Sequence, residues 1–196
     1  MNNHTFIIGI TGGSGCGKTT LLNAIRDKGG LVLDCDAIYH GLLKTDQAML
    51  SAIDDRFPGV MEDGVLNRKK LGTIVFADKQ ALLDLNAITH AAVKKEVLRR
   101  LESQPKLAAI DAIGLFEGNL AELCDVTVAV TAPTEDRVNR LMNRDGISQE
   151  YARSRIAAQH DDRWFREKCT CVLENNSNFD AFATKCVDFL RNLDII

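Results

Sequence analysis

Short apolar runs alternate along the chain with longer segments of helical periodicity. Apolar runs predict β-strands at residues 5–10, 31–34, 107–111, 126–131 and 170–174. Helical periodicity predicts helices at residues 18–28, 134–144, 148–159 and 179–193. Strands that are apolar at nearly every position are buried on both faces of a sheet. The pattern therefore predicts an α/β fold with a parallel sheet flanked by helices.

A long, mainly helical stretch separates the second and third predicted strands. It covers residues 37–104, with turns at residues 57–59 and 63–64. No repeat, low-complexity tract or flexible linker interrupts the chain. We expect one α/β domain in which this stretch is a helical insertion.

The composition is that of an ordinary globular protein. The chain has 196 residues, of which 45% are apolar and 26% charged, and its formal net charge is −3. Binders of nucleic acid or of membrane surfaces need a net basic field, so neither partner is expected. An anionic ligand must instead be bound by a local cluster of cations or backbone amides.

The start of the chain and the cysteines indicate a reducing compartment. The apolar run at residues 6–10 is too short for a signal peptide or a membrane span, and no basic leader precedes it. We therefore expect a cytoplasmic protein. Six cysteines without metal-binding spacing are interpreted as free thiols: Cys16, Cys35, Cys124, Cys169, Cys171 and Cys186.

Residues 12–19, Gly-Gly-Ser-Gly-Cys-Gly-Lys-Thr, form the strongest motif and are called the phosphate loop below. They satisfy the pattern G-x-x-x-x-G-K-[ST] directly between a predicted strand and a predicted helix. Glycines let the backbone N–H groups point at phosphate oxygens, and the helix adds its positive end. Lys18 can reach the β- and γ-phosphates, and the Thr19 hydroxyl can bind Mg²⁺. The loop predicts a nucleoside triphosphate site lined by Gly13, Ser14, Gly15, Cys16, Gly17, Lys18, Thr19 and Thr20.

Three carboxylates follow predicted strands at the sheet edge where ligands collect. Asp34 and Asp36 end the second strand, where alternate residues face the same side. A carboxylate there can accept the proton of an attacking hydroxyl, or it can cap the next helix. Asp111 ends the third strand and can hold Mg²⁺ through water, or it can cap the strand end.

A phosphate loop does not determine where the phosphoryl group goes. The chain is too short for most motor proteins and lacks the Asn-Lys-x-Asp signature of small GTPases. A kinase for a small acceptor is the first hypothesis, and a non-catalytic regulator that binds ATP is the alternative from another class. A regulator has no use for a base at the acceptor edge, which favours the kinase.

Five ordered segments resemble the dephospho-coenzyme A kinases. They read IIGITGGSGCGKTT, LDCDAIYH, DGVLNRKKLGTIVF, LNAITH and RDGIS…RIAAQ, and they span almost the whole chain. The resemblance implies phosphorylation of the ribose 3′-hydroxyl of dephospho-coenzyme A by ATP with Mg²⁺, the last step of coenzyme A synthesis. Uridine kinases carry a very similar loop, so another small-molecule kinase, for a nucleoside or nucleotide, is the alternative.

The resemblance also implies a division of the chain into three parts. The nucleotide-binding core would comprise residues 1–36, 106–135 and 168–196, the coenzyme A-binding insertion residues 37–105, and the lid residues 136–167. We expect a monomer or a weak homo-oligomer.

Residue roles follow by position in the motifs. The resemblance makes Asp36 the general base, with Asp34 beside it to support the acceptor or the hydration shell of Mg²⁺. It implies that Asn175 contacts adenine, where the alternative is a turn. The residues expected to bind the acceptor are Asp34, Asp36, His90, Phe116 and Glu117. For His90 the alternative is a hydrogen-bonded structural histidine, and for Phe116 a core residue.

Three arginines recur at helical spacing after the fourth predicted strand. Arg137, Arg140 and Arg144 lie three and four residues apart, which puts them on one helix face. They can clamp a triphosphate during transfer, or form a solvated face paired with Asp136 and Asp145. The resemblance favours Arg140 and Arg144 as ATP-binding lid residues, with Arg140 and Lys18 assisting catalysis.

The chain departs from the family pattern at three places. Ile113-Gly114 stands where the family has Pro-Leu, Ala91 where it has Pro, and Thr170 where it has Asp. None of these departures removes a charge from the expected transfer step.

Overall fold

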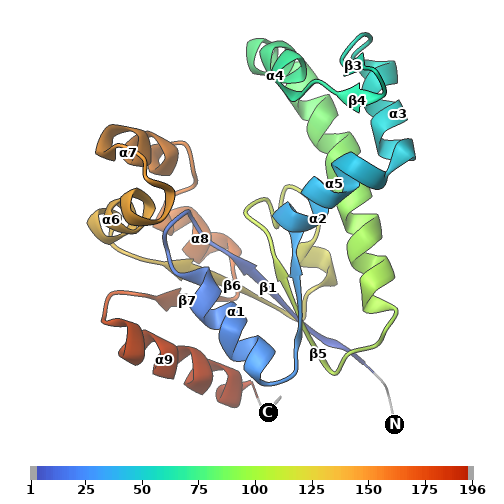
Figure 1. The fold of residues 1–196 in the computed structure, drawn as a ribbon. Coiled ribbons are helices and arrows are strands. Elements are labelled where there is room, and N and C mark those ends of the chain that lie inside the picture. The colour runs from blue at the N-terminus through green and yellow to red at the C-terminus, as the bar shows by residue number, and fades with distance from the viewer. Residues whose placement is uncertain (1–3, 194–196) are drawn as a thin grey trace.

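Five parallel strands form the centre of the molecule, as the apolar runs predict. A computed structural model describes residues 4–193. The sheet has the order β2-β5-β1-β6-β7 (Figure 1), and all its pairs are parallel. Its strands are β1 (Phe6–Thr11), β2 (Leu31–Asp34), β5 (Leu107–Asp111), β6 (Val126–Thr131) and β7 (Cys171–Glu174).

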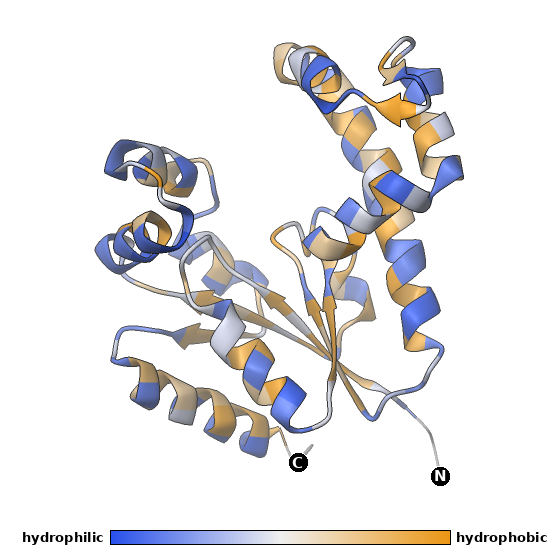
Figure 2. Cartoon of the chain, viewed as in Figure 1, coloured by the Kyte–Doolittle hydropathy of each residue, from blue (hydrophilic) through white to orange (hydrophobic). Residues whose placement is uncertain are grey.

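Helices cover both faces of this sheet, which explains why its strands are apolar throughout (Figure 2). All six residues of β6 are buried. Helices α1 (Lys18–Asp27) and α9 (Phe179–Asn192) pack on one face through Leu21, Ile25, Phe182 and Leu190. The end of α5 (Lys79–Leu101) and the loop around the 3₁₀ turn η1 (Ala121–Leu123) pack on the other face.

The segment between β2 and β5 builds a second, mainly helical body beyond the edge of the sheet (Figure 1). It contains α2 (Cys35–Thr45), α3 (Gln47–Arg56), α4 (Arg68–Ala77) and α5. Its own apolar cluster includes Ile53, Phe57, Val60 and Leu71. Helix α5 joins it to the sheet, because Val93 and Val97 pack in the sheet's cluster.

A small antiparallel hairpin in this body was predicted only as a turn. Strands β3 (Met61–Glu62) and β4 (Val65–Leu66) have two residues each. Both residues of the connecting turn are left-handed, Asp63 with φ 49° and Gly64 with φ 77°, as a two-residue hairpin turn requires. Strands this short carry no alternating pattern, so the sequence could not reveal them.

Three helices follow β6: α6 (Thr134–Asp145), α7 (Gln149–Ala157) and α8 (Asp162–Lys168). Val138 and Leu141 of α6 pack against Ala152 of α7. The sequence missed α8, because seven residues carry too little periodicity. Asp161 caps this helix by accepting from the N–H of Trp164.

Strand β7 begins at Cys171, one residue later than predicted, and the Thr170 hydroxyl instead accepts from the N–H of Thr127. Among residues 4–193, no helix combines the length and the apolar character that crossing a membrane requires. The division into core, insertion and lid stays a prediction.

Candidate active site

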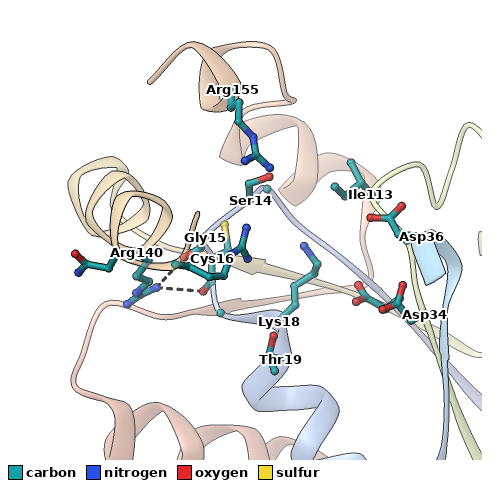
Figure 3. A pocket seen from close by; sticks show the side chains of 16 residues that line it. Ser14, Gly15, Cys16, Lys18, Thr19, Asp34, Asp36, Ile113, Arg140 and Arg155 are labelled. Atoms are coloured by element: carbon teal, nitrogen blue, oxygen red, sulfur yellow. Dashed lines mark hydrogen bonds between the residues drawn. The ribbon is translucent and has the colours of Figure 1, made fainter. Parts of the chain in front are cut away.

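A cavity of about 630 Å³ opens at the carboxyl edge of the sheet (Figure 3). The phosphate loop, three carboxylates and three arginines line it, so segments far apart in sequence meet there as predicted. The charged residues at its wall are Lys18, Asp34, Asp36, Asp111, Arg140, Arg144 and Arg155.

The phosphate loop has the positive φ angles that its glycines predict. Gly12, Gly15 and Gly17 have φ values of 129°, 78° and 99°. A Cβ on Gly12 would lie 2.2 Å from the carbonyl oxygen of Val130 in the neighbouring strand. Glycine is therefore required there both by conformation and by space.

Side chains on either side of the loop hold its carbonyl groups. Lys18 Nζ donates to the Gly12 carbonyl at 2.8 Å. Asn175, which is buried after β7, donates through Nδ2 to the Cys16 carbonyl at 2.9 Å. Asn175 thus supports the loop from behind, and its contact with adenine stays a prediction.

Of the three arginines expected on one face of α6, Arg140 and Arg144 line the cavity and Arg137 does not. Arg140 Nη1 donates to the carbonyls of Gly15 at 3.1 Å and Cys16 at 3.4 Å. Arg144 forms a bidentate ion pair with the neighbouring Asp145. The pairing with Asp145 that we gave as the alternative is therefore present, although Arg144 still faces the cavity.

Arg137 lies behind the loop and is only 5% exposed. Its Nε donates to the Ser14 carbonyl at 3.0 Å, and its Nη2 donates to Gln159 Oε1 at 3.0 Å. The same Gln159 oxygen accepts from the Ser14 N–H, and Gln159 Nε2 donates to Ser14 Oγ. Sequence reasoning missed Gln159, although it ends the RIAAQ segment.

The two acceptor-edge carboxylates are arranged differently from the prediction. Strand β2 ends at Asp34, whose carboxylate caps α2 by accepting from the Ala37 N–H at 2.9 Å. Asp36 lies in the first turn of α2. The prediction that Asp34 and Asp36 end one strand and face the same side is therefore wrong. Both side chains nevertheless border the cavity opposite the phosphate loop (Figure 3). The capping alternative thus holds for Asp34.

Asp111 lies at the end of β5 and is partly buried. Its Oδ1 is buried and has no hydrogen-bond partner within residues 4–193. Burial raises the pKa of the Asp111 carboxyl to about 6, and the charge of Lys18 opposes that rise. An orphaned carboxylate oxygen in a polar cavity fits a hydrated cation or an ordered water.

The oxygen donors here suit a hard cation that keeps part of its water shell. Thr19, Asp34 and Asp111 line the same cavity. Within residues 4–193, however, no group of three or more His, Cys, Asp or Glu side chains could hold a metal ion by itself. A cation at this site would therefore depend on water and phosphate oxygens as well.

A second cavity of about 240 Å³ adjoins Asp36. Tyr39, Asn86 and His90 line it together with apolar side chains. Of the residues that line it, the sequence predicted Asp36 and His90 as acceptor contacts, but not Tyr39 or Asn86. Tyr39 and Asn86 lie in the quoted segments LDCDAIYH and LNAITH, which could have signalled them.

Phe116 and Glu117 lie apart from both of these cavities. Phe116 packs edge-on against Trp164, with ring centroids 5.5 Å apart. Glu117 Oε1 lies 2.9 Å from Nε2 of His160, whose ring stacks on Trp164. Glu117 also lines a neighbouring cavity of about 500 Å³ together with His90. Their role in acceptor binding stays a prediction.

Comparison with known proteins identifies the family. A family model described as dephospho-CoA kinase matches residues 6–181. The chain belongs to the dephospho-CoA kinase family. The dephospho-CoA kinase of Saccharomyces cerevisiae is 36% identical, over 87% of this chain and 76% of its own length. That of Dehalococcoides mccartyi is 36% identical, over 94% of this chain and 95% of its own.

Solved structures agree on the fold of this family member. The protein TT1252 from Thermus thermophilus has a TM-score of 0.81 and 32% identity, covering 97% of this chain and 98% of its own. The dephospho-CoA kinase from Campylobacter jejuni has a TM-score of 0.68 at 24% identity, covering 95% of this chain and 96% of its own. The latter likeness bears on the fold alone.

The raised pKa of Asp111 predicts a pH-dependent stability. The native state holds this proton more tightly than the unfolded chain, whose carboxyl titrates near 3.8. The stability contribution is therefore present below pH 3.8 and lost as pH rises through about 6. Above pH 6, the free energy of unfolding of Asp111→Asn should be larger than that of the wild type, by up to about 3 kcal/mol. Near pH 3.8 the two free energies should be equal. Urea unfolding between pH 3.8 and 8 measures this difference, and a pH-independent difference would contradict it.

Proposed function

We propose that the protein transfers the γ-phosphoryl group of ATP to the ribose 3′-hydroxyl of dephospho-coenzyme A. The products are coenzyme A and ADP, and the reaction is the last step of coenzyme A synthesis. One observation carries the proposal: in a member of this family, the phosphate loop and Asp36 line one cavity of about 630 Å³. Donor and acceptor groups can thus meet in a single site.

The proposed donor site is the phosphate loop with the first turn of α1. The first N–H groups of a helix lack intrahelical partners, so the start of α1 at Lys18 can bind phosphate oxygens. Lys18 adds a positive charge for the β- and γ-phosphates. The proposed ATP-binding residues are Gly13, Ser14, Gly15, Cys16, Gly17, Lys18, Thr19, Thr20, Arg140, Arg144 and Asn175.

Magnesium is the cation we propose for this site. The Thr19 hydroxyl would hold it directly, and Asp34 or Asp111 would hold it through water. A cation held there would neutralise part of the negative charge of the phosphates during transfer. The orphaned Oδ1 of Asp111 supports this placement.

Asp36 is the proposed general base for the acceptor. Its carboxylate accepts the proton of the 3′-hydroxyl as the oxygen attacks the γ-phosphorus, and the β-phosphate oxygen leaves with ADP. The adjoining cavity with His90 and Asn86 would take the nucleoside end of the acceptor. Phe116 and Glu117 are proposed as further contacts, the latter through the cavity it shares with His90.

The helices after β6 are the proposed lid, within residues 136–167. Arg140 and Arg144 of α6 and Arg155 of α7 line the cavity (Figure 3). Closure over the phosphates would exclude water, which competes with the acceptor hydroxyl. Residues 37–105 are proposed to bind coenzyme A, and the remaining segments to form the nucleotide-binding core. We further propose a cytoplasmic protein that is a monomer or a weak homo-oligomer.

An acceptor assay tests this function. Incubated with MgATP and dephospho-coenzyme A, the purified protein should form coenzyme A and ADP in equal amounts, as measured by mass spectrometry. Uridine and nucleoside monophosphates, offered in parallel, should stay unchanged because they lack the acceptor's extended chain. Transfer to uridine or to a nucleotide instead would favour another small-molecule kinase. ADP without any phosphorylated acceptor would leave only the nucleotide site supported.

Substitution of the proposed base tests the mechanism. Asp36→Asn keeps the shape of the side chain but removes its capacity to accept a proton. The turnover number should fall by about 10²–10⁴-fold, while ATP affinity and thermal stability stay close to those of the wild type. Steady-state kinetics and calorimetric ATP titration measure both quantities. Near-normal turnover by the folded variant would rule out Asp36 as the base.

A further inference from the structure

Arg137 is a buried cation whose hydrogen-bond partners are all neutral. Arg137 is 5% exposed, and its guanidinium donates to the Ser14 carbonyl and to Gln159 Oε1. In the part of the chain from residue 4 to residue 193, no carboxylate forms an ion pair with it. Its neighbour Arg140, by contrast, lines the phosphate cavity directly.

Such a charge is costly unless something compensates it. Removing a guanidinium from water costs several kcal/mol, and a partner of opposite charge normally offsets that cost. Asp161 and Asp162 line the small cavity of about 390 Å³ that Arg137 also borders. Neither pairs with Arg137, and the Asp161 carboxylate accepts from the N–H of Trp164. The side chains of residues 4–193 therefore leave this charge only partly offset.

The guanidinium lies directly behind the phosphate loop. A Cβ built on Gly13 would lie 2.1 Å from Arg137 Nη2, and one on Gly15 would lie 3.1 Å from Arg137 Cα. Gly13 and Gly15 also line the phosphate cavity. Only one layer of loop backbone thus separates the guanidinium from the place where phosphates would bind.

The surroundings of Cys16 show that the field of Arg137 reaches into the loop. Burial raises the pKa of the Cys16 thiol, and the charges of Arg137 and Lys18 both act to lower it. Asp162 acts in the opposite sense. Lys18 faces the phosphates from the cavity, so the loop carries one cation in front and one behind.

Gln159 fixes this cation relative to the loop. Its Oε1 accepts from both Arg137 and the Ser14 N–H, and its Nε2 donates to Ser14 Oγ at 2.9 Å. Arg137 itself holds the Ser14 carbonyl. Because these bonds engage the N–H, the carbonyl and the hydroxyl of Ser14, the guanidinium cannot shift without moving the loop.

We propose that Arg137 is a positioning residue for nucleotide binding, and that the polyphosphate bound in front of the loop is its missing counter-ion. This inference rests on the proposed function, because it needs an anion at the phosphate loop. Arg137 acts through the loop backbone and its field, without touching the ligand. The attraction should therefore grow with the negative charge of the ligand.

The test compares ligands of graded charge in two variants. Arg137→Gln removes the charge but can still donate a hydrogen bond, whereas Arg137→Lys keeps the charge on a different shape. Titration calorimetry without divalent cations would give dissociation constants for ATP, ADP, AMP and adenosine. In Arg137→Gln the ATP constant should rise by about 10-fold, with progressively smaller changes for ADP and AMP and none for adenosine. Arg137→Lys should keep most of the ATP affinity.

A matched control is available on α7. Arg153 pairs with Glu135 of α6 at 2.8 Å and does not line the phosphate cavity. Arg153→Gln removes one positive charge from the same pair of helices, yet it should leave all four dissociation constants unchanged. This control separates a local effect behind the loop from a change in net charge.

Three results would overturn the inference. Equal loss for ATP and adenosine would mean that Arg137 only supports the loop's shape. Equal loss in Arg137→Lys and Arg137→Gln would mean that its geometry, not its charge, matters. Unchanged ATP binding in Arg137→Gln, with normal binding by the wild type, would exclude any role in nucleotide affinity.

If the wild type binds no nucleotide even with Mg²⁺ added, the proposed function fails instead. Should Arg137→Gln not fold, the ATP dissociation constant of Arg137→Lys still decides. The proposal predicts that it stays close to that of the wild type because the charge is retained, and a loss of ATP affinity in this folded variant would overturn it.

Discussion

The hydrogen bonds that fix the carbonyl groups of the phosphate loop set the geometry of the whole site. Four side chains supply most of them: Lys18, Arg137, Arg140 and Asn175. A peptide group whose carbonyl is held on one side presents its N–H toward the other, and inward N–H groups bind phosphate oxygens. These donors come from α1, from α6 and from the end of β7. The parallel sheet matters because it brings these segments to one edge.

At this edge of the sheet, charges of opposite sign lie on opposite sides of one cavity. Cations of α1, α6 and α7 face it from the loop side, and Asp34, Asp36 and Asp111 face it from the other. Burial keeps the pKa of Asp111 near 6, so its charge is held against a desolvation penalty. A bound polyphosphate would offset the positive charges on the loop side, and a hydrated cation would offset the carboxylates on the other side. Phosphoryl transfer needs this arrangement, because its catalysis is mostly positioning and charge neutralisation.

Local patterns predicted the features that depend on few neighbours. The phosphate loop is specified by the spacing of its glycines and Lys18, and the strands by unbroken apolar runs. The carboxylates follow from strand ends, although Asp36 lies in the first turn of a helix rather than at the end of a strand. The hairpin at residues 61–66 and helix α8 escaped prediction because elements of two and seven residues carry almost no periodicity.

Tertiary contacts explain the rest. Helical spacing puts Arg137, Arg140 and Arg144 on one side of α6, but it cannot say which of them faces a cavity and which is buried behind a loop. Gln159 and Asn175 hold the loop across 145 and 159 residues of sequence, a relation that no local pattern encodes. The contacts of Phe116 with Trp164 and of Glu117 with His160 also join residues far apart in sequence, so no local pattern encodes them.

In the proposed reaction, the phosphate loop and Asp36 serve one transfer between two bound substrates. A crystal structure with a non-hydrolysable ATP analogue, Mg²⁺ and dephospho-coenzyme A tests it most directly. The 3′-oxygen should lie within about 3 Å of the Asp36 carboxylate and about 3–3.5 Å from the γ-phosphorus, in line with the leaving oxygen. A 3′-hydroxyl bound outside the cavity, or held by a group other than Asp36, would contradict it.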